Sequence, residues 1–365
     1  MPSDKERSSL RYLALPCVAL TALAFSWSSK PSDPILFFLA LFLVLAVFTS
    51  VHHAEIIALK VGEPFGSLIL ALAVTVIEVG MILVIFLESP DANINLARDT
   101  VFSAVMITTN GIVGIALLIK SLRQGIATFN SSGVSGALAV LVALSVLSLI
   151  LPSVTVSSPG PTFTKVQLIF AALISLVLYL TFVAVQTVRH RDYFLPPARS
   201  DNTIPIEEHV EAPTRKEAFS SLFGLLLSLV AVVGLAKVTS PLIQGFVDKN
   251  NLPQMLVAIS IAIVVLLPES ISAIKAARFG RTQTSFNLAY GSALASIGLT
   301  VPVIATISVL FDYKVNLGLN AAEIVLLSLT FFVSILTVFL GRATLLQGII
   351  HLSIFSSFIM FAATP

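Results

Sequence analysis

The chain lacks most of the features that define a soluble enzyme or a disulfide-stabilised secreted protein. It has one cysteine in 365 residues, Cys17, which excludes an internal disulfide and a cysteine-based metal site. Only 11% of its residues are charged, whereas a soluble globular protein has about 25%. The sequence has no zinc motif, P-loop or dinucleotide-binding fingerprint, and no polar stretch long enough for a soluble enzyme domain.

Long apolar runs take the place of these features. Hydrophobic residues make up 56% of the chain, and runs of about 17 or more apolar residues, each able to cross a bilayer as a helix, recur along its length. The predicted spans are 11–28, 35–52, 66–87, 101–119, 134–152, 167–188, 219–237, 254–274, 285–311, 321–340 and 343–363. The sequence therefore predicts an all-α polytopic membrane protein with about 11 transmembrane helices.

The first span admits two interpretations. Basic residues precede its apolar run, and Ala22-Leu23-Ala24 resembles a signal-peptidase site. We favour an ordinary first helix over a cleaved signal peptide. Cleavage would leave ten spans with the same orientation.

The distribution of basic residues predicts the orientation of the chain in its membrane. Of the 21 Lys and Arg residues, 15 fall in the N-terminus and the loops on one side, and 6 fall on the other side. Because basic residues favour the cytoplasmic side, we expect the N-terminus and the long polar connector at 189–218 to be cytoplasmic. The C-terminus is then expected outside.

Two glutamates lie within apolar spans. Glu78 falls in the run 66–87 and Glu269 in the run 254–274. A carboxylate near the bilayer centre is costly, at least about 2.5 kcal/mol on insertion scales, and such residues usually mark ion or proton pathways. The two glutamates therefore point to a transporter.

The spans are distributed symmetrically around the connector. If residues 1–34 form a tail and an extra helix, five spans lie in 35–188 and five in 219–365. An odd number of spans in each half places the halves in opposite orientations, as in the inverted repeats of many secondary transporters. Glu78 and Glu269 occupy the second span of each half, so we expect them to meet near the middle of the membrane.

Neutral oxygen ligands are predicted beside the two carboxylates. The third span of each half is rich in small and polar residues: Ser103, Thr108, Thr109 and Asn110 in one, and Asn287, Ser292 and Ser296 in the other. From these we take Asn110, Ser292 and Ser296, with Thr75 from the Glu78 span, as cation- or proton-binding candidates. Pro268 removes a backbone donor beside Glu269 and frees carbonyl oxygens for a cation.

Three further polar residues are candidates for gating or for an ion-access path. Glu63 begins the span at 66–87, and Glu323 begins the span at 321–340, where an acid also favours a helix start. His351 lies inside the last span, where it is either a proton relay or a packed polar side chain. The sequence alone leaves both interpretations of each residue open.

Two segments resemble a known family. The string VGEPFGSLILALAVTVIEV at 61–79, and LLPESISAIKAA with FNLAYGSALASIGLTVPV inside 266–303, resemble the signature regions of bacterial ChaA-type sodium-potassium/calcium–proton antiporters. These belong to the cation/proton exchanger branch of the Ca²⁺:cation antiporter superfamily. The resemblance implies ten core helices in two inverted five-helix repeats plus one N-terminal helix, with Glu78 and Glu269 as paired cation and proton ligands. It also implies a bacterial inner (cytoplasmic) membrane.

One position departs from the superfamily pattern. Exchangers of the wider superfamily often carry Gly-Asn-Ala just before the first glutamate, and here Val74-Thr75-Val76 stand in that place. The choice among Ca²⁺, Na⁺ and K⁺ is therefore left open by the sequence, as is the oligomeric state.

These observations predict cation/proton exchange through one shared site. Two bare carboxylates at low dielectric repel each other, so the empty site is expected to hold protons that leave when a cation binds. We expect no cofactor and no nucleic-acid partner; the partners are the transported cations, protons and the lipid bilayer. The alternatives are a Na⁺/H⁺ or K⁺/H⁺ antiporter with little Ca²⁺ transport and a passive cation channel. An intramembrane enzyme would need a nucleophile with a base or a metal triad, and the spans offer neither.

Overall fold

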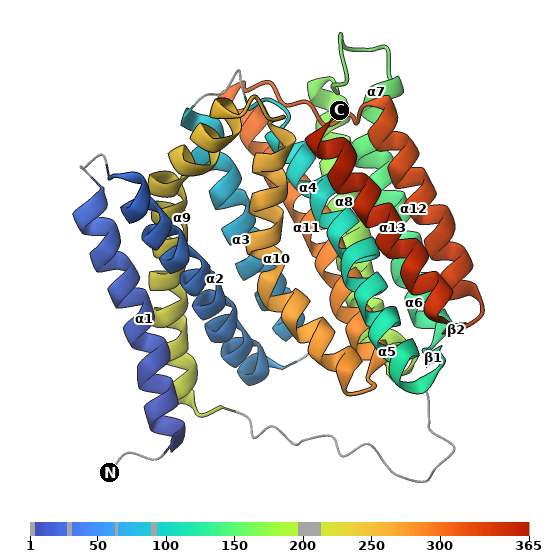
Figure 1. Cartoon of the computed structure of the whole chain (residues 1–365), viewed down its shortest axis with the longest axis horizontal. Coiled ribbons are helices and arrows are strands. Elements are labelled where there is room, and N and C mark those ends of the chain that lie inside the picture. Colours follow the sequence, from blue (N-terminus) through green and yellow to red (C-terminus); the bar gives the residue numbers. More distant parts are fainter. Residues whose placement is uncertain (1–3, 28–30, 63–64, 89–92, 196–212, 365) are drawn as a thin grey trace. The chain divides into compact units, whose positions relative to one another are not determined.

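The computed structural model describes residues 4–27, 31–62, 65–88, 93–195 and 213–364, and these residues are almost entirely helical (Figure 1). The gating candidate Glu63 and most of the predicted linker, residues 196–212, lie outside the described residues. Helices satisfy their own backbone hydrogen bonds, which is what a chain with this many apolar runs requires in lipid.

The chain forms two compact units, and each combines segments from both sides of the connector. The first contains the residues up to Leu96 together with Ala212–Pro268. The second contains Ala97–Glu211 together with Glu269–Pro365. Each unit is therefore built from two long stretches of the chain that are distant in sequence.

The first unit is a helical bundle. Its elements are α1 (Asp4–Ser26), α2 (Asp33–Val61), α3 (Phe65–Glu88), α9 (Arg215–Lys249) and the part of α10 (Met255–Arg278) that ends at Pro268. Helix α2 packs along α9 and α3, and α1 also packs on α9 (Figure 1). Helix α9 is thus the shared partner of α1, α2 and α3.

Glycines bring the helices of the first unit close together. Gly80 of α3 faces Val233 of α9, whose Cγ2 atom would lie 2.6 Å from a Cβ placed on this glycine. Gly224 of α9 lies against the ring of His53 on α2. Small residues allow such close backbone approach between membrane helices, where apolar lipid supplies no hydrophobic drive for association.

The second unit is larger and holds most of the irregular helical turns. Its elements are α4 (Leu96–Met106), η1 (Ile107–Ile112), α5 (Val113–Gln124), β1 (Ala127–Thr128), α6 (Ser131–Ser145), η2 (Val146–Ile150), α7 (Leu151–Val154), α8 (Lys165–Ala184), η3 (Val185–Arg189), η4 (Arg191–Phe194), the end of α10, α11 (Thr282–Phe311), α12 (Ala321–Phe339), β2 (Arg342–Ala343) and α13 (Leu345–Ala363). Helix α11 packs on α8 and α6, and α13 packs on α5. The turns η1, η2 and η3 are π-helical.

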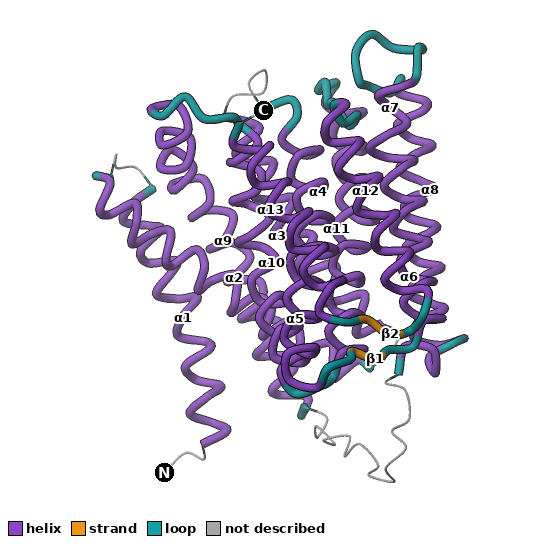
Figure 2. The backbone as a smooth tube through the Cα atoms, turned by 45° about the vertical axis from the view of Figure 1, so that its right-hand side comes forward, coloured by secondary structure: helices purple, strands orange, loops and turns teal. Residues whose placement is uncertain are grey.

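Backbone contacts tie the second unit at both ends. At one end β1 and β2 pair antiparallel and join the α5–α6 loop to the α12–α13 loop (Figure 2). At the other end the segment before α12 is held by Gly318 N–H donating to Pro161 O and Leu319 N–H donating to Leu149 O, both at 2.9 Å. These bonds satisfy backbone groups that loops between helices would otherwise leave unpaired.

Local sequence signals mark the starts of several helices. A polar N-cap residue and an acid or amide three positions later form reciprocal capping boxes. They are Thr164 with Gln167 at α8, Thr214 with Glu217 at α9, Asn320 with Glu323 at α12, and Thr344 with Gln347 at α13.

The predicted spans agree with the helices in number and place. Among the described residues ten helices are long and apolar enough to cross a membrane, with α4, η1 and α5 counted as one, and Ala14–Ser26 is a shorter apolar helix. The span predicted at 219–237 was too short, because α9 runs from Arg215 to Lys249. The charged Lys237 does not end the helix: its ammonium lies 4.6 Å from the centre of the Trp27 ring.

The structure describes helical residues at both ends of the predicted linker. Its first residues form η4, where Phe194 is buried against Phe182, with 5.8 Å between ring centroids, and Asn287 Nδ2 donates to Phe194 O at 2.7 Å. Its last residues form the capping box of α9. The polar, proline-rich composition of the segment gave no sign that Phe194 packs its start against the second unit.

Candidate functional site

Glu78 lies on the buried side of α3, in the first unit. Its side chain is 2% exposed, and Thr75, one turn earlier, is buried beside it on the same helix. The Thr75 hydroxyl donates to Ala71 O at 2.8 Å. A hydroxyl that donates its hydrogen in this way keeps its lone pairs for a cation, so the Glu78 face of α3 carries both charged and neutral oxygens.

Glu269 lies on α10 directly after Pro268 and is half-buried. Pro268 is the last residue of the first unit, and Glu269 begins the α10 segment of the second. Because proline has no N–H, the carbonyl one turn before it lacks its usual helical donor. Glu78 and Glu269 belong to different units, so their predicted pairing stays a prediction.

Asn110 and His351, both predicted candidates, are in direct contact. Both are 0% exposed, and His351 Nδ1 lies 3.0 Å from Asn110 Oδ1. The other end of the Asn110 carboxamide donates from Nδ2 to Thr330 Oγ1 at 2.9 Å. The other nitrogen of the histidine, Nε2, lies 3.1 Å from Thr337 Oγ1. The second unit thus buries a connected polar network of four side chains from η1, α12 and α13.

Asn110 brings the π-helical turn η1 into this network, and the sequence explains the turn. Thr108 Oγ1 donates to Ala104 O at 2.7 Å, and Thr109 Oγ1 donates to Val105 O at 2.5 Å. Threonine hydroxyls that bond the preceding turn satisfy carbonyls that a widened turn leaves open. Gly111 follows in the same turn, where an added Cβ would lie 3.6 Å from the Phe355 ring. The turn therefore packs closely on α13.

The two candidate serines lie one turn apart on α11, a helix that packs on η1. Ser296 is buried and Ser292 is half-buried. Asn287, which the sequence grouped with them, has another role: it accepts from Gln283 at 2.9 Å and donates to Phe194 O. Its amide therefore helps to hold the η4 turn in place.

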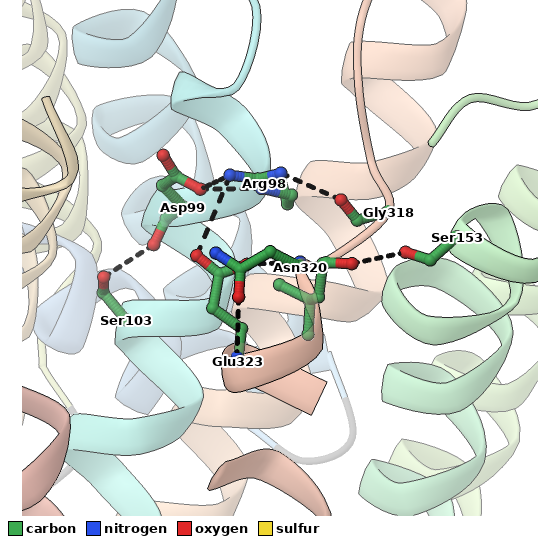
Figure 3. Close-up of polar contacts among 8 residues, drawn as sticks. Arg98, Asp99, Ser103, Ser153, Gly318, Asn320 and Glu323 are labelled. Carbon is green, nitrogen blue, oxygen red and sulfur yellow. Dashed lines mark hydrogen bonds and ion pairs between the residues drawn. The ribbon is translucent and has the colours of Figure 1, made fainter. Parts of the chain in front are cut away.

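A buried charged cluster surrounds Glu323 at the start of α12 (Figure 3). Arg98 Nη2 lies 2.6 Å from Asp99 Oδ1 and 3.8 Å from Glu323 Oε1, and Arg98 Nη1 donates to Gly318 O at 2.9 Å. Glu323 Oε2 accepts from Asn320 N–H at 2.8 Å. Glu323 is therefore a helix cap within an ion-paired cluster that contains two carboxylates and one guanidinium.

Sequence reasoning missed several members of these groups. Arg98 and Asp99 were assigned to a loop, although they begin α4 and are buried. Thr330 and Thr337 stand seven positions apart in an apolar run, a spacing that places them on one face of a helix. That spacing is the signal that could have linked them to one network. Glu63 lies outside the described residues.

No group of three or more His, Cys, Asp or Glu side chains in the described residues is arranged to hold a metal ion. The candidate residues described above offer two carboxylates and the neutral oxygens of hydroxyls and an amide. Hard cations accept such mixed oxygen ligands.

The fold and these buried polar groups define a class: a polytopic helical membrane protein of the transporter type. The sodium/calcium exchanger protein family model matches residues 33–188 and 220–364. The chain belongs to this family. This family model and the ChaA relative described next together confirm the resemblance to ChaA-type antiporters that the sequence predicts.

Two bacterial relatives resemble the chain over most of its length. It is 46% identical over 320 residues to the putative ionic transporter y4hA of Sinorhizobium fredii (strain NBRC 101917 / NGR234), covering 88% of this chain and 86% of the relative. It is 30% identical over 360 residues to the sodium-potassium/proton antiporter ChaA of Escherichia coli (strain K12), covering 98% and 97%.

A solved structure shares the fold. The H⁺/Ca²⁺ exchanger CAX superimposes with a TM-score of 0.73 at 15% sequence identity, covering 99% of this chain and 90% of that chain. At this level of identity the likeness concerns the fold alone. The chain therefore has the helical architecture of that exchanger.

Proposed function

We propose that the protein is a secondary active transporter that exchanges cytoplasmic cations, Ca²⁺ and/or Na⁺ and K⁺, for protons through a site shared by Glu78 and Glu269. One observation carries this proposal: two membrane-spanning helices of an exchanger-family chain each hold a glutamate, and Glu78 is almost fully buried. Intramembrane carboxylates are retained at a cost and usually serve ion or proton movement.

Charge balance gives the coupling mechanism. Two ionised carboxylates in a medium of low dielectric repel each other and are poorly solvated, so without a cation the site holds protons. A cation replaces those protons, and protons return only when the cation leaves. One site that cannot hold both substrates links their fluxes, and the proton gradient then drives cation export.

Neutral groups complete the proposed ligand set. Thr75 lies one turn from Glu78, and Asn110, Ser292 and Ser296 come from η1 and α11 of the second unit. Carbonyl oxygens near Pro268 add to these. The inverted arrangement of 35–188 and 219–365 is part of the proposal, because it places the two glutamates in equivalent positions.

Two of the three gating candidates, Glu323 and His351, are assigned by their surroundings. The ion pair and helix-capping bonds of Glu323 support a structural role at the end of α12. His351 belongs to the network around Asn110. Glu63 is retained as a gating candidate on its sequence position alone.

A second candidate is a Na⁺/H⁺ or K⁺/H⁺ antiporter with little Ca²⁺ transport. The Escherichia coli relative, named a sodium-potassium/proton antiporter, favours it. A passive cation channel is the third possibility, and it differs because ion flow would not require proton movement.

Transport in proteoliposomes separates these functions. The purified protein is reconstituted with a pH-sensitive dye inside, an imposed proton gradient is applied, and Ca²⁺, Na⁺ and K⁺ are added in turn. Antiport gives cation-dependent dye recovery, and the responding cation identifies the substrate. A cation flux of unchanged size without a proton gradient and without proton movement would indicate a channel.

Glutamine variants test the shared site. Glu78→Gln and Glu269→Gln keep the side-chain shape but remove the charge, so each is expected to abolish exchange in a folded protein. Glu217→Gln makes the same change at an exposed helix start, where glutamine also caps, and should exchange like wild type. Near-normal exchange by either of the first two variants would contradict the mechanism.

The same site predicts the pH dependence of exchange. Protons compete with cations for the carboxylates, so apparent cation affinity should fall as pH falls, and exchange should be fastest on the alkaline side of neutral. A cation titration at several pH values measures this. A pH-independent affinity would exclude competition at one site.

A further inference from the structure

The Asn110 carboxamide is oriented by the hydrogen bonds of its neighbours. Thr330 Oγ1 donates to Leu326 O at 2.8 Å, so toward Asn110 the same hydroxyl acts as an acceptor. It therefore receives Nδ2–H of Asn110. The other end of the carboxamide, Oδ1, must then be the atom that faces His351 Nδ1.

This orientation also fixes the protonation of His351. Because Oδ1 of Asn110 only accepts, His351 Nδ1 carries the hydrogen. Nε2 of the neutral ring is then an acceptor, and the Thr337 hydroxyl donates to it. The result is a chain of hydrogen bonds in one direction, from Thr337 through His351 and Asn110 to Thr330, which starts and ends on α12.

The surroundings leave this chain little freedom. All four side chains are buried at 3% exposure or less. Gly114 of α5 lies against Leu352 and His351, where an added Cβ would come within 2.9 Å of Leu352 Cγ. The Cβ of His351 thus packs against α5, while its ring bonds Thr337 of α12 on one side and donates to Asn110 of η1 on the other.

We propose that His351 is a positioning residue for cation binding, which holds the oxygen of Asn110, rather than its amide hydrogens, in the ligand position. The Oδ1 atom accepts one bond from His351 and keeps a second lone pair for a cation. Without the Nδ1–H donor the carboxamide can rotate and present N–H groups, which repel cations. This inference rests on the proposed function, because it takes Asn110 as a ligand.

Two neutral substitutions separate the two sides of the imidazole. In His351→Asn the amide nitrogen falls near the place of Nδ1 and keeps the donor to Asn110. In His351→Gln it falls near the place of Nε2 and reaches Thr337 instead. Both remove the ring, and both leave an uncharged amide. A purely structural role for His351 predicts similar effects of the two variants.

The expected results differ between the variants. His351→Gln should raise the KM for the cation by about tenfold, the scale of one lost hydrogen bond, with a smaller change in the maximal rate. His351→Asn should keep the KM near that of wild type. Thr337→Val removes only the bond on the other side of the ring and should also leave the KM unchanged. Equal KM values for the Asn and Gln variants would overturn the proposal.

A second variant tests the orientation of the Asn110 carboxamide without changing His351. Thr330→Val is close to isosteric and removes the acceptor that holds the amide end of Asn110, so it should raise the KM in the same direction as His351→Gln. If His351→Gln fails to fold, this variant decides the outcome. An unchanged KM in folded Thr330→Val would contradict the proposal.

Cation affinity is measured in parallel without transport, from the rise in Tm that Ca²⁺, Na⁺ or K⁺ produces in detergent. Absence of proton-coupled exchange in the wild type would contradict the proposed function. The order of cation affinities among the His351 and Thr330 variants would still support or overturn the positioning role.

Discussion

The guanidinium of Arg98 connects two helices through Glu323: its Nη2 atom lies 3.8 Å from Oε1 of that residue, while the same nitrogen lies 2.6 Å from Oδ1 of Asp99. All three side chains are buried. The cluster joins the start of α4 to the start of α12 within the second unit. Arg98 supplies the positive charge of this cluster, so its loss would leave two buried carboxylates uncompensated.

Arg98→Met should therefore destabilise the protein strongly. The substitution leaves Asp99 and Glu323 together in a buried place, and we expect a loss on the order of 3 kcal/mol. Thermal unfolding in detergent measures it. Arg123→Met, the same change on an exposed arginine of α5, is the control and should cost less than about 1 kcal/mol. Adding Asp99→Asn to Arg98→Met should restore part of the loss, and a double variant less stable than the single one would contradict this account.

Two glycines of α11 should respond in opposite directions to alanine. A Cβ at Gly298 would lie 2.7 Å from Cβ of Tyr179 on α8, whereas a Cβ at Gly291 would meet nothing within 4 Å. Gly298→Ala should cost about 1–3 kcal/mol through overpacking, and Gly291→Ala should gain up to about 1 kcal/mol from the lower helix entropy cost. Unfolding midpoints of the two variants, measured side by side, test the tight α8–α11 contact. Equal shifts would argue against it.

The middle of the connector should be dispensable while its start is not. Deleting 199–208 leaves both η4 and the α9 capping box in place, and cation exchange should remain measurable. Phe194→Ala removes the buried ring that packs on Phe182 and should cost about 3 kcal/mol. Complete loss of exchange in a correctly inserted deletion would show that the removed residues belong to the transport machinery.

Reporter fusions test the predicted orientation. Because 15 of the 21 basic residues lie on one side of the predicted spans, the C-terminus should be outside and the connector inside. An enzyme active only outside the cytoplasm should give signal when fused after Pro365 and none when inserted at Asp201. The reverse pattern would invert the orientation and exchange the two access sides.

Composition and the length of the apolar runs were sufficient to predict the helices, because in lipid the apolar length of a segment decides whether it spans the bilayer. They failed where polar residues have partners distant in the chain. The predicted span ends at Lys237 because the sequence does not show that this lysine has a partner, the Trp27 ring, on another segment. The start of the connector was assigned to a linker because it is polar, although Phe194 in it is buried against Phe182.

The candidate site shows the same division. The sequence alone identified Glu78 and Glu269, because a carboxylate inside an apolar run is conspicuous without any knowledge of its neighbours. It also identified Asn110 and His351 as polar residues in spans, with no signal that they meet. The roles of Arg98, Thr330 and Thr337 were not visible in it.

What the sequence determined by itself is the class of the protein, its membrane-spanning helices and the residues whose charge is out of place in lipid, since these follow from local hydrophobicity. The tertiary structure alone decided which polar groups satisfy one another. A hydrogen bond such as that between Asn110 and His351 depends on the packing of η1 against α13, and nothing in the local sequence of either segment specifies the other.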